Sequence, residues 1–244
     1  MRAVTFDFWN TLLSADDAGI RDRRLAAWLG LLAGEGFELD GDQVRTAMRH
    51  AGSRFDAAWR GNRFYGAADS VDDMLDHLGI TVSAATRDGL VASITDPDPS
   101  HQPPPTPHVV EALDALRRRG VRIGIICDVG LAPSTTLRRY LRAHDMLDFF
   151  DHVSFSDEVG TYKPDPLIFQ HALRGLGGVA PGDAAHVGDL RRTDIGGAQG
   201  VGMFAVRYRG MYDDPGSVDD GTDSVEGDAV IADHADLLGA LGLG

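Results

Sequence analysis

The chain has 244 residues, which is enough for one large domain or for a core with a smaller lid. Apolar residues make up 43% and charged residues 25%, a globular composition that excludes a fibrous or largely disordered chain. The net charge of −14 disfavours nucleic acid and anionic lipid as partners. It does not exclude a small anionic substrate, because local arginines and a metal ion reverse the sign where they gather.

The single cysteine, Cys127, rules out an intrachain disulfide, which fits a reducing compartment. The first seven residues reach an acidic residue without the apolar stretch of a signal peptide. No apolar run approaches the roughly 20 residues that span a bilayer. These features predict a cytoplasmic protein with no membrane partner.

The first elements in chain order are a short strand and a long helical block. Residues 2–7 are predicted to form a buried strand that ends before Asn10-Thr11. From about residue 16 to residue 94, apolar residues recur at helical spacing. The proline-rich segment 96–107 is compatible with neither a helix nor a central strand, so we predict a hinge there and a second one at 14–16.

After this segment, helices and strands alternate to the end of the chain. Helices are predicted over 109–119, 134–142, 166–176, 193–200 and 235–241, and strands over 121–127, 152–155, 184–187, 203–206 and 229–231. This alternation predicts a parallel, doubly wound α/β sheet, which binds ligands at the carboxyl ends of its strands. The stretch 213–228 is rich in Asp, Gly and Ser and is predicted to be a mobile acidic loop.

Charged side chains stand at or near the predicted strand ends. Asp7 follows the first strand, where a carboxylate is able to attack phosphorus or carbon; the alternative is a residue that caps a turn. Asp189 and Asp194 are spaced to converge on a hard cation such as Mg²⁺, although Asp194 would also serve as a helix N-cap. Lys163, the only lysine in the chain, precedes a proline and would direct its charge at an anion or at the nucleophile.

The order of these motifs resembles the haloacid dehalogenase superfamily. The motifs that carry the resemblance are Asp7-x-x-x-Thr11, the strand end at Cys127, Lys163-Pro164-Asp165-Pro166 and Gly188-Asp189 followed by Asp194. The resemblance covers residues 1–14 and 104–244 and implies a Rossmann-like parallel-sheet core. It also implies that residues 15–103 form an all-helical cap domain inserted after the first motif.

The resemblance assigns roles to individual residues. Asp7 would be the nucleophile, Lys163 would stabilise its carboxylate and the transferring group, and Thr11 would support the loop on the substrate side. Mg²⁺ would be held by Asp7, Asp189, Asp194 and the backbone carbonyl of Trp9.

Two positions depart from the phosphatase pattern of this family. Trp9 stands where such phosphatases usually carry a second Asp that works as acid and base, and the loss of such a group costs on the order of 10²–10⁴ in rate. Cys127 stands where Ser or Thr would contact phosphate, and a thiol is a weaker donor. Asp128, the next residue, is a candidate replacement acid. In the cap, Arg60 and Arg63 are candidates for contact with the distal part of the substrate, with solvated surface arginines as the alternative.

These features favour a Mg²⁺-dependent hydrolase that acts on a small phosphorylated metabolite through an aspartyl-phosphate at Asp7. The first alternative is a 2-haloacid dehalogenase with the same nucleophile, because that branch has an aromatic residue at the position of Trp9 but needs no metal. The second is a non-catalytic or very slow binding or regulatory protein. The phosphonate-cleaving branch is rejected, since it needs a cap lysine and residues 15–103 contain none.

Overall fold

The computed structural model describes residues 1–15, 18–96, 102–218 and 220–244, so part of each predicted hinge lies outside the described residues. The chain divides into two compact units. The core unit comprises Met1–Asp16, Pro103–Asp128 and Arg138–Gly244, and the helical unit comprises Asp17–Gln102 and Val129–Leu137.

The core unit is built on a six-stranded sheet in which every pairing is parallel. Its strands are β1 (Ala3–Phe6), β2 (Arg122–Cys127), β3 (His152–Phe155), β4 (Ala184–Gly188), β5 (Phe204–Tyr208) and β6 (Ala229–Ile231). Their order across the sheet is β3-β2-β1-β4-β5-β6, so the first strand lies near the middle. The predicted α/β class with a Rossmann-like parallel sheet is therefore confirmed.

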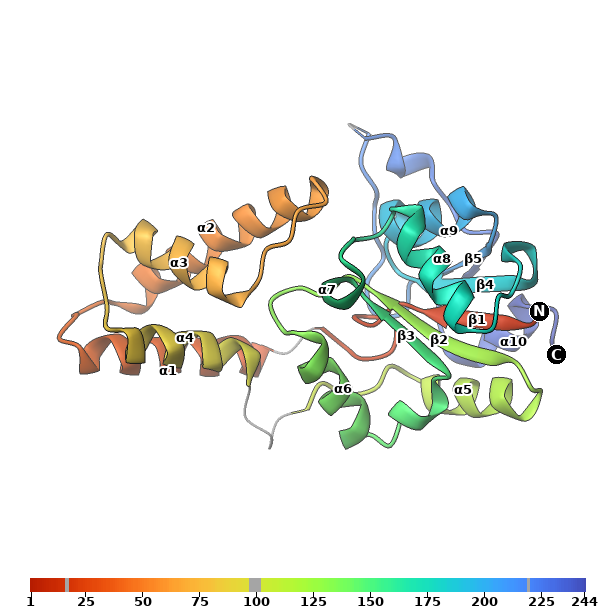
Figure 1. The fold of residues 1–244 in the computed structure, drawn as a ribbon, viewed down its shortest axis with the longest axis horizontal. Helices are drawn as coiled ribbons and strands as arrows, with labels where there is room; N and C mark the ends of the chain where they lie inside the picture. Colours follow the sequence, from red (N-terminus) through yellow and green to blue (C-terminus); the bar gives the residue numbers. More distant parts are fainter. Residues whose placement is uncertain (16–17, 97–101, 219) are drawn as a thin grey trace. The chain divides into compact units, whose positions relative to one another are not determined.

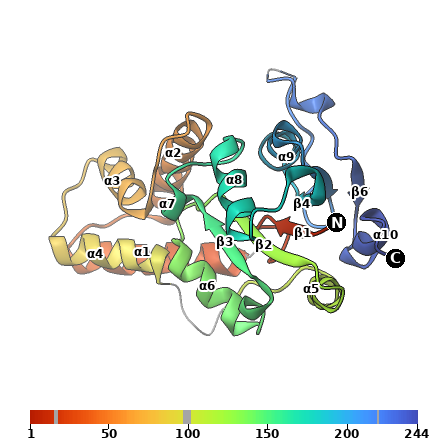
Figure 2. The same cartoon turned by 45° about the vertical axis from the view of Figure 1, so that its right-hand side comes forward.

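Helices cover both faces of this sheet (Figures 1 and 2). They are α5 (Val109–Arg118), α6 (Ser134–Ala143), α7 (Ser156–Val159), α8 (Pro166–Gly175), α9 (Gly196–Val201) and α10 (Leu237–Ala240). Under α8 and α9, Ile126 of β2 and Ala205 of β5 share a fully buried cluster with Ile168 and Phe169. Burial on both faces explains why these strands are continuously apolar in sequence rather than alternating.

The helical unit consists mainly of α1 (Ala18–Gly34), α2 (Gly41–Arg60), α3 (Ala67–Leu78) and α4 (Ala84–Thr95). Local sequence sets their ends. Asp40 and Gln43 form a capping box at the start of α2, and α3 ends at Gly79 with a φ of 67°, a conformation that favours glycine. Trp28 and Val44 belong to the buried cluster that the four helices share.

One segment belongs to a different unit from the one predicted from the sequence. Residues 129–137, expected in the core, belong to the helical unit because Leu131 packs against its apolar cluster and the Thr136 hydroxyl donates to the Thr95 carbonyl. The end of the proline-rich stretch is anchored to the core, since Pro105 pairs with Leu13 in an antiparallel bridge.

The acidic stretch 213–228 was predicted to be a mobile loop. Several of its described residues pair with two arginines of the core unit. Arg207 bonds Glu226 and Asp213, with Nε to Oε1 at 2.6 Å and Nη1 to Oδ1 at 2.5 Å. The amide of Arg191 donates to Asp214 at 2.7 Å. These pairs tie the loop to β5 and to the turn after β4, so its acids neutralise buried or half-buried arginines.

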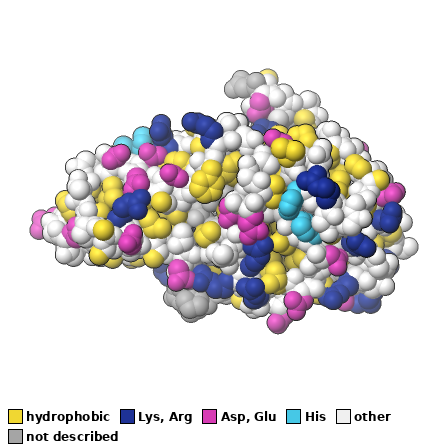
Figure 3. All heavy atoms as spheres, viewed as in Figure 1, with side chains coloured by type: hydrophobic (Ala, Val, Ile, Leu, Met, Phe, Trp, Pro, Cys, Tyr) yellow, Lys and Arg dark blue, Asp and Glu magenta, His cyan; other side chains and the backbone are white. Residues whose placement is uncertain are grey.

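The surface drawn in Figure 3 carries acidic and basic side chains interspersed with one another. A helix of the length and apolarity needed to cross a bilayer was sought among the described residues, and none was found.

Candidate active site

Three neighbouring strands, β2, β1 and β4, end at the same edge of the sheet. Phe6 pairs with Ile125 on one side and Val187 on the other, and the Asp7 amide donates to the Val187 carbonyl at 2.8 Å. This register carries Asp7 beyond the last paired residues, next to the strand end that leads into Asp189. The strand-end position predicted from the alternating pattern is therefore the place where the acids meet.

Lys163 lies between two of these acids. Its Nζ is 2.5 Å from Oδ1 of Asp7 and 2.6 Å from Oδ1 of Asp194, and it also donates to the Ile126 carbonyl at 3.1 Å. Only 2% of the lysine side chain is exposed, so these bonds act in a site shielded from water. The sole lysine of the chain is thus paired with two residues of the acid cluster.

Asp194 is fixed from three directions. Besides Lys163, the ring Nε2 of His186 lies 3.1 Å from its Oδ1, and the Leu190 amide donates to its Oδ2 at 2.9 Å. A side chain at Gly188 would collide with the Asp194 carboxyl group, so only glycine permits this approach. Asp194 lies inside a π-helical turn, Arg191–Ile195, and its carboxylate turns back towards the preceding loop rather than capping α9.

Burial and mutual repulsion perturb these acids. Burial, opposed by Lys163 and reinforced by Asp194, raises the pKa of Asp7 to about 7. Burial and then the neighbouring carboxylates of Asp7 and Asp194 raise the pKa of Asp189 well above its usual value. Burial also opposes ionisation of Asp194, but the charge of Lys163 and the hydrogen bond from His186 outweigh it and lower its pKa.

The residues of the cluster fit a divalent cation. Asp7, Asp189 and Asp194 are all buried, and one oxygen of each lies within 4.8 Å of the others. Three carboxylates face one ammonium, so the cluster has fewer positive than negative charges. Oxygen ligands and an excess of negative charge are what Mg²⁺ requires.

The loop after β1 holds the residues that the sequence singled out there. The Trp9 ring packs edge-on against Phe8 and Tyr140, with centroids 5.0 and 6.1 Å apart, so it supplies an aromatic wall in place of an acid. Thr11 is fully buried, and its carbonyl accepts from the Thr106 hydroxyl at 2.6 Å and lies 2.8 Å from the ring Nε2 of His234. Thr11 therefore sits where it supports the loop; its role towards substrate stays a prediction.

Cys127 and Asp128 end β2 at the same edge. Cys127 is buried, and burial followed by the nearby Asp7 raises the pKa of its thiol well above the usual value. It therefore stays a neutral thiol. Asp128 is partly exposed, and its Oδ1 accepts the Lys163 amide at 2.8 Å. This carboxylate thus positions the lysine loop, and its predicted acid–base role stays a prediction.

Arg60 and Arg63 are exposed residues of the helical unit, at the end of α2 and in the loop that follows. Their predicted contact with substrate stays untested.

Sequence reasoning missed three residues around the cluster. His186 is buried and lies between Asp194 and Thr5, whose hydroxyl is 2.9 Å from its Nδ1. Asn10 reaches Asp189 with its amide at 3.5 Å. Tyr212 is 44% exposed, and partial desolvation followed by the charges of Asp214 and Asp189 raises its pKa. Only Asn10 had a sequence signal, its position within the first motif.

A family model described as haloacid dehalogenase-like hydrolase matches residues 1–202. The chain belongs to this family. Among curated relatives, the glyceraldehyde 3-phosphate phosphatase of Methanopyrus kandleri is 40% identical over 111 residues, which are 45% of this chain and 46% of that protein. The chain thus matches about half the length of such relatives.

Two solved structures of the family share the fold over nearly the full length. The haloacid dehalogenase-like phosphatase from Thermococcus onnurineus is 25% identical with a TM-score of 0.65, covering 99% of this chain and 98% of that chain. The 2-haloacid dehalogenase from Pseudomonas syringae pv. Tomato is 23% identical with a TM-score of 0.66, over the same shares of the two chains. Because phosphatases and dehalogenases share this fold, the fold does not choose between the two reactions.

Proposed function

We propose that this chain is a Mg²⁺-dependent phosphatase that acts on a small phosphorylated metabolite, with Asp7 as nucleophile. The observation that carries the proposal is the buried cluster of Asp7, Asp189 and Asp194, in which Lys163 pairs with Asp7 and Asp194. A dehalogenase acting through Asp7 needs no metal. A site with three converging carboxylates has the oxygen ligands that a Mg²⁺-dependent enzyme requires.

Asp7, Asp189 and Asp194, with the Trp9 carbonyl as a further ligand, would hold the cation, which would offset the negative charge of the phosphoryl group. The Asp7 carboxylate forms a bond to phosphorus as the bond to the leaving oxygen breaks. Lys163, held between Asp7 and Asp194, favours the ionised form of Asp7 and faces the charge that builds up. Water then attacks the aspartyl-phosphate, which releases phosphate and restores Asp7.

The two steps need an acid that protonates the leaving oxygen and a base that removes a proton from the attacking water. We assign both roles to Asp128, because Trp9 has no titratable group and Asp128 follows the neighbouring strand end. Aryl and acyl phosphates have leaving groups that need little protonation, so they are the substrates on which an atypical site of this kind should work best. Glyceraldehyde 3-phosphate also belongs in the assay, since it appears in the names of the matched relatives.

Trp9 favours the second candidate, 2-haloacid dehalogenation, because an aromatic residue at this position is the dehalogenase pattern. In that reaction Asp7 would displace halide from carbon, and water would hydrolyse the resulting ester. Both reactions use the same nucleophile, so metal dependence separates them.

The test is release of phosphate from an aryl phosphate and from glyceraldehyde 3-phosphate, and of halide from a 2-chloroacid, each with Mg²⁺ or with chelator. Asp7→Asn removes the nucleophile, and Asp183→Asn is the matched control, since Asp183 is an exposed acid before β4. Phosphate release that needs both Mg²⁺ and Asp7 supports the proposal. Halide release that survives chelator would replace it with the dehalogenase, and turnover by neither route would favour a binding protein.

A further inference from the structure

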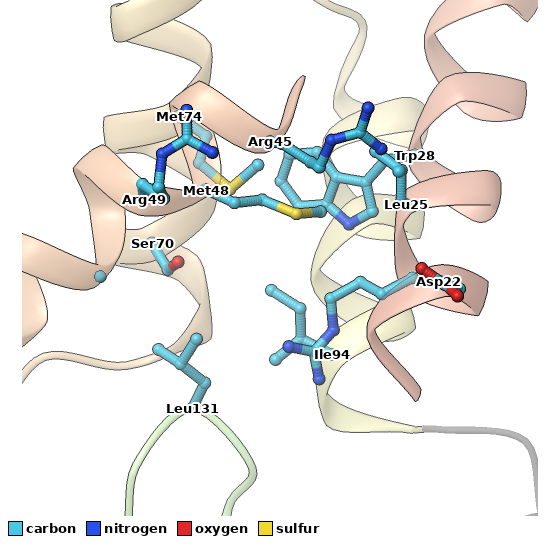
Figure 4. Close-up of a pocket in the computed structure, with 12 residues that line it drawn as sticks. Asp22, Leu25, Trp28, Arg45, Met48, Arg49, Ser70, Met74, Ile94 and Leu131 are labelled. Carbon is cyan, nitrogen blue, oxygen red and sulfur yellow. The ribbon is translucent and has the colours of Figure 1, made fainter. Parts of the chain in front are cut away.

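The helical unit contains a pocket of its own, with a volume of about 420 Å³. This volume falls within the range of known small-molecule sites. The pocket is enclosed by residues of α1, α2, α3 and α4, with Leu131 closing one side (Figure 4). Nothing in the proposed phosphoryl chemistry uses it.

The inner wall of this pocket is apolar. The accessible part of this wall is formed by Leu25, Met48 and Leu131, which are partly buried, whereas Trp28, Met74 and Ile94 of the lining are buried. The indole Nε1 of Trp28 donates to the Ser93 hydroxyl at 2.9 Å, so this buried polar atom is satisfied without a ligand. Methionine side chains adapt to the shape of a bound group, so this wall suits a flat or irregular hydrocarbon body.

Arginines supply the charge of the pocket. Arg24, Arg45 and Arg49 line it, and among the described lining residues Asp22 is the acidic one. Figure 4 shows Arg45 and Arg49 extending from α2 on the same side of the pocket. In a chain of net charge −14, three arginines around one cavity reverse the local sign.

Arg45 and Arg49 keep hydrogen-bonding capacity for a ligand. Arg45 bonds Asp42 through one nitrogen at 2.6 Å, and Arg49 bonds the Thr46 hydroxyl through one nitrogen at 2.8 Å. A guanidinium group carries five N–H donors in a fork that matches carboxylate and phosphate oxygens. The partial neutralisation of Arg45 by Asp42 lowers the net charge but leaves most of these donors available.

We propose that this pocket binds a small organic anion in which a carboxylate or phosphate group is attached to an apolar, preferably aromatic, body. The body packs against Leu25, Met48 and Leu131, and the anionic group pairs with Arg45 and Arg49. A purely apolar ligand would leave the arginine donors unused, and an inorganic anion would leave the apolar wall in contact with water. The proposal does not depend on the reaction at Asp7.

The experiment is calorimetric titration of the full chain with phenylacetate in the presence of chelator. Without a metal ion, the acid cluster of the core unit lacks the cation that would attract a carboxylate, so binding at that site is suppressed. Acetate and 2-phenylethanol are the matched probes, because the first has the charge without the body and the second has the body without the charge. We expect one phenylacetate per chain, bound at least about ten-fold more tightly than either control.

Two glycine variants locate the bound probe. Gly52 lines the pocket, and a Cβ built there meets nothing within 4 Å, so Gly52→Leu fills the space without a clash. Leucine also favours the interior of α2 over glycine, so the variant should fold. Gly30→Leu is the matched control, since Gly30 is a helix glycine with the same open surroundings outside the lining. We expect Gly52→Leu to weaken phenylacetate at least about ten-fold and Gly30→Leu to leave it unchanged.

Two arginine variants test the anionic group on the same helix. Arg49→Gln should weaken phenylacetate several-fold while 2-phenylethanol is unaffected, and Arg54→Gln should change neither, because Arg54 is exposed and pairs with Asp73 instead. Equal affinity for phenylacetate and 2-phenylethanol would overturn the proposal. Unchanged binding in Gly52→Leu, or binding lost in Asp7→Asn, would also overturn it, since the probe would then occupy another site.

Discussion

The two units of this chain use charge in opposite ways. In the core unit three buried carboxylates gather around Lys163, whose side chain is 2% exposed. In the helical unit arginines surround an apolar pocket, and the side chain of one of them, Arg45, is 50% exposed. The first arrangement confines charge where water cannot screen it, so it shifts pKa values and prepares a nucleophile. The second leaves charge hydrated, so it selects a ligand at little cost to the fold.

The largest expected effect comes from removing the buried cation of the acid cluster. Lys163→Met should lower phosphate release by at least about 10³-fold, because Asp7 loses the charge that opposes its protonation and the transferring group loses a positive partner. It should also cost on the order of 3–5 kcal/mol of stability, since the buried carboxylates lose their partner. Enzyme assays and urea unfolding measure the two losses. Mg²⁺ should restore part of the stability but not the turnover.

Arg54→Gln is the matched loss of a positive charge from the exposed surface, and it should leave both quantities near their original values. Turnover by Lys163→Met within about ten-fold of the original protein would contradict the role given to this lysine.

A smaller loss is expected from Asp128→Asn. The asparagine keeps an oxygen that accepts the Lys163 amide, so the loop geometry should survive while the titratable group is gone. We expect a fall in kcat on the order of 10²-fold for an alkyl phosphate and a much smaller fall for an aryl phosphate, with KM little changed. Equal losses for both substrates would show that Asp128 positions Lys163 rather than transferring a proton.

The pH dependence of stability separates buried from exposed acids. Burial raises the pKa of Asp7 from 3.8 to about 7, so between these pH values the folded protein holds a proton that the unfolded chain has released. Asp7 therefore destabilises the fold increasingly as pH rises from about 4 to 7. With chelator present, Asp7→Asn should gain on the order of a few kcal/mol over the original protein across this window.

Chemical unfolding at several pH values measures this difference. Burial lowers the pKa of His234 to about 4, so this residue makes the fold more stable as pH rises through the same window. His234 is present in both proteins, so its contribution cancels in the difference between them. Parallel stability curves for the two proteins would contradict the raised pKa of Asp7.

The smallest expected effect is that of salt on the helical unit. Raising NaCl from about 50 to 500 mM should weaken phenylacetate binding roughly two- to five-fold, because exposed arginines are screened. The buried pair of Lys163 and Asp194 is screened much less, so the stability lost in Lys163→Met should hardly change with salt. A strong salt dependence of that loss would mean that water enters the acid cluster.

Much of the core unit was predictable because local patterns carry it. All six strands were located to within about two residues, since strands buried on both faces are short apolar runs between turns. Residues 193–195 of the turn Arg191–Ile195 were predicted as the start of an ordinary helix, because helical spacing does not distinguish an α-helix from a π-helical turn that aims Asp194 at Lys163. The ion pairs of the loop 213–228 were not predicted, because its composition does not show which arginines it will meet.

The sequence by itself determined the parallel α/β class, the helical block before the proline-rich segment, and the identity of the acids and the lysine. These follow from hydrophobic spacing and from motifs whose order along the chain is readable. Only the tertiary structure decided that His186 braces Asp194, that Leu131 belongs with the helical unit, and that three arginines surround one apolar pocket. Those relations join residues distant in the chain, and no local pattern encodes which distant side chains become neighbours.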